Sequence, residues 1–112
     1  MSAAADTTLE IAPEDVAARR AAGEAIAILD VREPWETELC AIEGSIKIPL
    51  GTLPENVAHL PQENPLIVVC HHGARSMRAV MWLKGQGFNN AINLRGGIDA
   101  WARLVDPAMV TY

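Results

Sequence analysis

The possible folds of this chain are limited chiefly by one short apolar run. The run ends at a cysteine, and a helical pattern follows almost at once. The run is LIVV at residues 66–69, and CHHGARS follows it at residues 70–76. Consecutive apolar, mostly β-branched residues are typical of a strand that is buried on both faces of a sheet. The helical pattern extends from Ser76 to Gln86, so the sequence predicts a strand, a loop from Cys70 to Arg75 and a helix.

The predicted loop is a place where negative charge is stabilised. A helix that begins directly after a tight loop points its unpaired backbone N–H groups, and the positive end of its dipole, into that loop. Gly73 can take positive φ without strain, so several N–H groups can point at one place. Arg75 adds a full positive charge. These groups favour the thiolate of Cys70 over its thiol, which makes Cys70 a nucleophile at neutral pH.

A buried structural cysteine at a strand end is the alternative interpretation of Cys70, because most free cysteines have that role. A structural cysteine would not require Gly73, Arg75 and a helix start at this spacing. We therefore interpret Cys70 as a functional thiol. The other cysteine, Cys40, is interpreted as a small buried hydrophobe, and a resolving role beside Cys70 stays open.

Four segments of the chain carry a resemblance to one known family. They are LDVRE at residues 29–33, GSIKIPL at residues 44–50, the loop CHHGARS at residues 70–76 and NLRGGIDAW at residues 93–101. The loop is similar to the active-site loop of the single-domain rhodaneses, and the other segments resemble that family's early strand-end motif, central strand and closing motif. One departure is Ser45, where many rhodaneses carry a histidine.

The resemblance implies a rhodanese-like α/β fold, with a five-stranded, mainly parallel sheet flanked by helices on both faces, over one domain of residues 1–112. It also implies a sulfurtransferase in which Cys70 takes sulfane sulfur from thiosulfate or a related small anionic donor as a persulfide. The acceptor would be cyanide, a thiol or a protein. The loop residues that would bind the substrate and the persulfide are His71, His72, Gly73, Ala74 and Arg75.

Individual roles can be assigned within this loop. Arg75 is expected to orient the loop and to attract the sulfonate of the donor. The side chains of His71 and His72 could donate hydrogen bonds to the substrate, or only their backbone N–H groups could act, and we favour the backbone interpretation. Adjacent side chains on a tight loop cannot easily converge on one ion, so we expect no metal site and no cofactor.

Asp30 and Arg32 follow the apolar strand predicted at residues 25–29. Functional loops lie at the carboxyl ends of parallel strands, so both residues are expected at the same sheet edge as Cys70. They could tune the pocket, or they could fix the loops through hydrogen bonds and an ion pair. We favour the second role, because charged residues at strand ends commonly cap neighbouring elements.

Charge is distributed unevenly along the 112 residues. Residues 1–69 hold 12 acidic and 4 basic groups, a net charge of −8, whereas residues 70–112 hold 2 acidic and 5 basic groups, a net charge of +3. The positive half carries the cysteine loop and suits a small anionic substrate. No basic cluster indicates nucleic acid binding. Without a secretory signal or a long apolar run, we expect a cytoplasmic protein that does not enter a membrane.

The rest of the chain alternates strands and helices, which favours a parallel sheet. Residues 1–7 are expected to be frayed. Strands are predicted at residues 9–11, 25–29, 46–48, 66–69 and 91–94, and helices at residues 13–22, 34–39, 52–60 and 76–86 and around Trp101. Trp35, Leu39 and Ile42 form an apolar set that we assign to the core rather than to an interface.

Two other functions compete with sulfur transfer. A cysteine phosphatase uses the same strand, loop and helix to hold a phosphate, but such enzymes have five residues between cysteine and arginine, whereas four separate Cys70 from Arg75. A module that carries sulfur or binds a partner without turning over free thiosulfate is the second alternative. Because Cys70 is present, sulfur carriage ranks above plain scaffolding.

Overall fold

One parallel sheet organises the computed structural model, which describes residues 9–112. The predicted frayed residues 1–7 lie outside this range. The sheet has five strands in the order β1-β5-β4-β2-β3, and every pairing is parallel. The strands are β1 (Glu10–Ile11), β2 (Ala27–Asp30), β3 (Ile46–Lys47), β4 (Leu66–Val69) and β5 (Ala91–Leu94). The expected five-stranded α/β fold is therefore confirmed.

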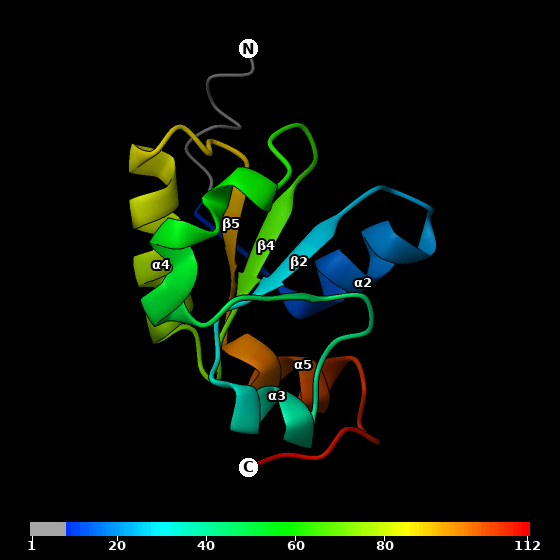
Figure 1. The fold of residues 1–112 in the computed structure, drawn as a ribbon. Coiled ribbons are helices and arrows are strands. Elements are labelled where there is room, and N and C mark those ends of the chain that lie inside the picture. Colours follow the sequence, from blue (N-terminus) through cyan, green and yellow to red (C-terminus); the bar gives the residue numbers. More distant parts are fainter. Residues whose placement is uncertain (1–8) are drawn as a thin grey trace.

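Helices cover both faces of this sheet, as predicted. Figure 1 shows α4 against one face and α2 and α5 against the other. The α-helices are α2 (Pro13–Ala21), α3 (Pro34–Leu39), α4 (Ala74–Gly85) and α5 (Gly97–Leu104), and the 3-10 helices are η1 (Leu50–Glu55) and η2 (Val57–His59). Proline at the first position of α2 and of α3 suits a helix start, where the missing N–H has no partner in any case.

Strand β4 lies at the centre and supplies both hydrophobic cores. Leu66 and Val68 pack with α4, η1 and η2, whereas Ile67 and Val69 pack with α2 and α5. All four residues are buried, as expected for a strand covered on both faces. The carboxyl ends of β2 and β4 adjoin, because Asp30 pairs in register with Val69. The residues after both strands therefore meet at one sheet edge.

Helical segments differ from the prediction in two places. The single helix predicted over residues 52–60 is wrong, because η1 and η2 replace it. Asn56, at φ −123°, interrupts the segment between the two 3-10 helices. Helix α4 begins at Ala74, two residues before the predicted start, with Gly73 at φ 111° as its N-cap residue. Ala74 and Arg75 thus belong to the helix and not to the loop.

The assignment of Trp35 and Leu39 to the core is wrong. Trp35 is 61% exposed and Leu39 is also exposed, whereas Ile42 is buried as predicted. Helix α3 buries Glu36 instead of its apolar residues. On α4, Met81 is exposed too, because this helix buries only one side, which consists of Ser76, Ala79, Val80 and Leu83.

Candidate active site

Cys70 lies directly after β4, and its sulfur is held by the start of α4. Its Sγ accepts hydrogen bonds from the backbone N–H of Gly73 at 3.1 Å and from the hydroxyl of Ser76 at 3.2 Å. The residue is only 1% exposed. Gly73 adopts a φ of 111°, which lets the chain turn from this N–H directly into α4, so the short loop forms a cradle for negative charge.

The first turn of α5 fixes the cradle from outside. Ile98 N donates to Cys70 O at 2.8 Å, and Asp99 N donates to His71 O at 3.1 Å. This approach requires glycine at position 97. A Cβ there would lie 2.4 Å from His71 O and 2.6 Å from Cys70 O, closer than real Cβ atoms come. Gly97 of the closing motif therefore serves the geometry of the cysteine loop.

Ser76 has one hydroxyl proton and two acceptors within reach, Cys70 Sγ and Asn93 Oδ1. The orientation of Asn93 is fixed, because its Nδ2 donates to Glu10 Oε2 and to Gly73 O, each at 3.2 Å. When Cys70 is a thiol, Ser76 can donate to Asn93 and accept the S–H. When Cys70 is a thiolate, the sulfur can only accept, so the hydroxyl proton must turn towards it.

Arg75 forms a bidentate ion pair with Glu36 of α3, with both N–O distances 2.8 Å. The hydrogen bonds from Arg75 are the main cause that lowers the pKa of Glu36 to about 2, against the opposing effect of burial. The pKa of Arg75 is raised in turn, chiefly by its hydrogen bonds to Glu36. Both groups are therefore charged over the physiological pH range, and the pair joins α3 to the start of α4.

Asp30 and Arg32 form a second, fully buried ion pair at the same sheet edge. Arg32 Nη2 lies 2.7 Å from Asp30 Oδ2 and donates to Cys40 O at 2.7 Å. Arg32 Nη1 donates to the phenol oxygen of Tyr112 at 3.0 Å. Arg32 thus joins the end of β2 to the residue after α3 and to Tyr112. These contacts agree with the loop-fixing role expected of the pair, which stays a prediction.

Tyr112 links the buried ion pairs to the histidines. Its hydroxyl donates a hydrogen bond to Glu36 Oε2 at 2.7 Å. Its ring stacks on the ring of His71, with the centroids 3.9 Å apart and an interplanar angle of 6°. Burial raises the pKa of Tyr112 to about 12, so the phenol remains a neutral donor at physiological pH. The ring of His72 also stacks on the ring of His71, with their centroids 3.9 Å apart. The rings of His71 and His72 therefore lie together, and the expectation that adjacent side chains on this loop do not converge on one ion stays a prediction.

Comparison of the whole chain with known proteins identifies its family. A family model described as rhodanese-like domain matches residues 12–104. The chain belongs to this family. The thiosulfate sulfurtransferase GlpE of Stutzerimonas stutzeri is 37% identical over 91 residues, which cover 81% of this chain and 82% of that protein. The crystal structure of a rhodanese-related protein from Thermoplasma volcanium has a TM-score of 0.78 at 35% identity, covering 85% of this chain and 91% of that one.

Longer relatives contain the rhodanese-like domain as a part. The probable adenylyltransferase/sulfurtransferase MoeZ of Mycobacterium tuberculosis is 39% identical over 92 residues, which cover 80% of this chain but only 24% of that protein. The chain thus spans about a quarter of this relative. Within residues 9–112, every helix is too short or too polar to span a bilayer.

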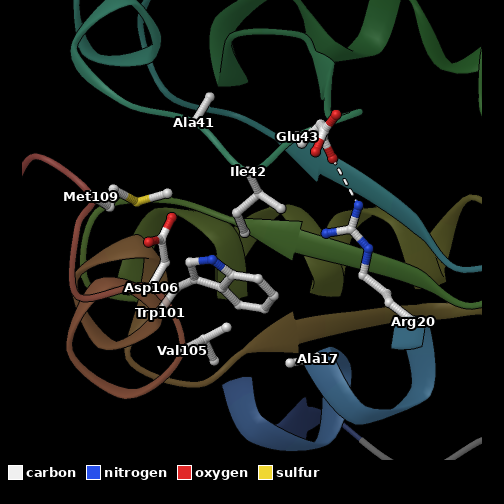
Figure 2. Close-up of a pocket in the computed structure, with 9 residues that line it drawn as sticks. All are labelled: Ala17, Arg20, Ala41, Ile42, Glu43, Trp101, Val105, Asp106 and Met109. Carbon is white, nitrogen blue, oxygen red and sulfur yellow. Dashed lines mark hydrogen bonds between the residues drawn. The ribbon is translucent and has the colours of Figure 1, made fainter. Parts of the chain in front are cut away.

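A pocket of the rhodanese-like domain lies away from the cysteine loop. It has a volume of about 440 Å³ and lies between α2, α5 and residues 41–43. Figure 2 shows Ile42 and Trp101 facing this hollow, with Arg20 reaching the backbone oxygen of Glu43 at 2.8 Å. None of the predicted site residues lines it, so this pocket is separate from the cysteine loop.

The structure brings together every predicted site residue and adds others. Sequence reasoning placed Ser76 and Gly97 inside family motifs without assigning them roles. Asn93, the first residue of the closing motif, likewise received no role, and Glu36 and Tyr112 were missed altogether. Glu36 is one of three glutamates in α3 and its flank, and only its burial distinguishes it from the others.

Proposed function

We propose that this rhodanese-like domain is a sulfurtransferase that carries sulfane sulfur on Cys70. The observation that carries this proposal is the Cys70 sulfur, which lies at the end of the central strand and accepts hydrogen bonds from Gly73 and Ser76. A sulfur atom held by donors, at a helix start, is stabilised as an anion. Both cysteines are free thiols, so a reducing compartment such as the cytoplasm suits the reaction.

The reaction is two successive displacements at sulfur. The Cys70 thiolate attacks the outer sulfur of thiosulfate, an S–S bond to Cys70 forms, the S–S bond of thiosulfate breaks, and sulfite leaves with the electron pair. A nucleophilic acceptor such as cyanide or a thiol then attacks the terminal sulfur and releases the Cys70 thiolate. Loss of one preorganised donor from a comparable anion site typically costs about 2.7–4 kcal/mol, so the hydrogen bonds from Gly73 and Ser76 are central to the step.

Sulfur carriage between proteins, without turnover of free thiosulfate, is the second candidate function. The burial of Cys70, at 1% exposure, favours it, because a partner protein can open the loop as it docks. A cysteine phosphatase is disfavoured by the four residues between Cys70 and Arg75. The anion cradle is correspondingly smaller than one built on five residues.

Intact mass measurement of the purified protein tests the proposal. Thiosulfate should add one sulfur atom to the wild-type protein and to Cys40→Ser, and cyanide should remove it. Cys70→Ser should gain none and should remain folded. A sulfur added to Cys70→Ser would contradict the assignment of the nucleophile. A wild-type protein that is loaded only by a persulfidated protein would favour sulfur carriage.

A further inference from the structure

Three potential metal ligands converge beside the cysteine loop. His71 and His72 stack with their ring centroids 3.9 Å apart and their planes at 30°. Asp99 lies in the first turn of α5. Each of the three residues offers one ligand atom, and these atoms all lie within 4.8 Å of one another.

Backbone, ring-stacking and side-chain contacts bring the three residues together. The backbone N–H of Asp99 donates to His71 O at 3.1 Å, which locks the start of α5 onto the loop. The His71 ring is held by its stack with Tyr112. His72 Nδ1 lies 4.0 Å from Asp99 Oδ2, already near contact distance. His71 and the backbone of Asp99 are thus held in place before an ion binds, whereas the exposed His72 ring becomes ordered on binding.

In the described part of the chain, the His71 ring has an unpartnered nitrogen, and the His72 ring is open to solvent. His71 Nε2 is buried, and it has no hydrogen-bond partner within residues 9–112. Such a nitrogen costs free energy unless a partner is supplied. The His72 side chain is 66% exposed, so an ion can approach from solvent and the ring is free to turn towards it. Besides His72, the Asp99 carboxylate contacts the exposed Arg103, at 3.2 Å, and such exposed pairs are weak.

We propose that His71, His72 and Asp99 form a binding site for a divalent transition-metal ion of the zinc type. Two imidazole nitrogens and one carboxylate oxygen suit zinc, which prefers ligands at about 2.0–2.2 Å and leaves a fourth position open in three-ligand sites. The ligand atoms must move closer from their present spacing. The exposed His72 ring can make most of that movement by side-chain rotation.

Zinc binding to the full chain, measured by isothermal titration calorimetry in a Cys70→Ser background, tests the site directly. This background excludes the most reactive thiolate as a ligand, and the measurement is independent of whether the protein transfers sulfur. We expect one zinc ion per chain. His72→Ala and Asp99→Asn should each weaken binding by about tenfold or more, as loss of a zinc ligand requires.

Matched controls separate this site from general charge and histidine effects. His59→Ala removes the exposed third histidine, and Asp106→Asn removes an equal negative charge beyond the end of α5. Both should leave binding unchanged. Imidazole NMR signals of His71 and His72 should shift with zinc, whereas those of His59 should not. Equal zinc binding by Asp99→Asn and Asp106→Asn would overturn the proposal. So would zinc binding by the wild-type protein that is lost in Cys70→Ser.

Discussion

Arg75, in the first turn of α4, and Glu36, in α3, are joined by two parallel N–O contacts of 2.8 Å. The Glu36 side chain is only 4% exposed. The charge of Arg75 is therefore matched inside the protein, before any substrate arrives. Because α4 carries Ser76 and follows Gly73, this ion pair holds the donors that surround Cys70. The contacts favour the loop-orienting role expected of Arg75 over direct attraction of a sulfonate.

Replacement of Glu36 should remove a pH dependence of stability. The pKa of Glu36 is lowered from 4.5 to about 2, chiefly by hydrogen bonds from Arg75. A lowered carboxyl pKa stabilises the folded state above pH 4.5, and this contribution is lost as the pH falls towards 2. Glu36→Gln should therefore lower the free energy of unfolding at neutral pH by about 3 kcal/mol and flatten its decline in acid.

Urea unfolding at neutral pH and at about pH 3, within the range where the pKa shift acts, measures this effect. Glu38→Gln is the matched control, because Glu38 is an exposed glutamate in the same helix. It should change little at either pH. If both variants lose the same stability, the ion pair with Arg75 does not account for the acid sensitivity.

Charge alone should not replace Arg75. Lysine keeps the positive charge but cannot form two parallel hydrogen bonds to Glu36. Hydrogen bonds to charged groups contribute about 1.5–3 kcal/mol, so Arg75→Lys and Arg75→Ala should both slow the loading of Cys70 by about tenfold or more. Rapid-mixing experiments with thiosulfate and with a neutral persulfide donor measure the rates. A normal rate in Arg75→Lys, with a loss for thiosulfate alone in Arg75→Ala, would indicate direct recognition of the anion instead.

Local signals made much of the fold predictable. Strand β4 was predicted with its observed bounds, because four consecutive apolar residues leave few alternatives. Helix α3 was also predicted with its observed bounds, because Pro34 marks its first position. The segment over residues 52–60 was not predictable in this way, since a proline in the first helical turn is compatible with either an α-helix or the observed 3-10 turns.

The environment of the site depends on contacts that sequence spacing does not reveal. Glu36 lies 39 residues before its partner Arg75, and Tyr112 lies 76 residues after Glu36. Asn93 lies 17 residues after Ser76 and contacts it only because β5 pairs beside β4. The loop motif predicts that Cys70 is activated. Which side chains activate it depends on how the strands are ordered in the sheet.

Ser76→Ala should reduce the reactivity of Cys70 without unfolding the protein. The hydroxyl of Ser76 lies 3.2 Å from Cys70 Sγ and donates to that sulfur, as does the backbone N–H of Gly73. Its loss removes a hydrogen bond to the thiolate, and we expect alkylation by iodoacetamide at neutral pH to slow by about tenfold. Ser45→Ala is the control, because Ser45 donates to Ile42 O away from the site. An unchanged alkylation rate in Ser76→Ala would mean that the Gly73 N–H suffices.

Gly97→Ala should disturb the cysteine loop from outside. The new Cβ would lie 2.4 Å from His71 O and 2.6 Å from Cys70 O, and position 97 has a φ of +64° that side chains rarely adopt. Either α5 or the loop must shift, so we expect a loss of about 2 kcal/mol or more in the free energy of unfolding. Persulfide loading should fall as well, because the Ile98 and Asp99 N–H groups no longer hold the loop.

Gly51→Ala provides the matched control for this last prediction. Position 51 has no positive φ, and a Cβ there meets no atom within 4 Å, so both stability and loading should stay near the wild-type values. Thermal unfolding and intact mass after thiosulfate, measured on both variants, separate the two positions. Normal loading by a destabilised Gly97→Ala would show that the contact of α5 with the loop serves folding alone, and that the cradle around Cys70 keeps its shape without it.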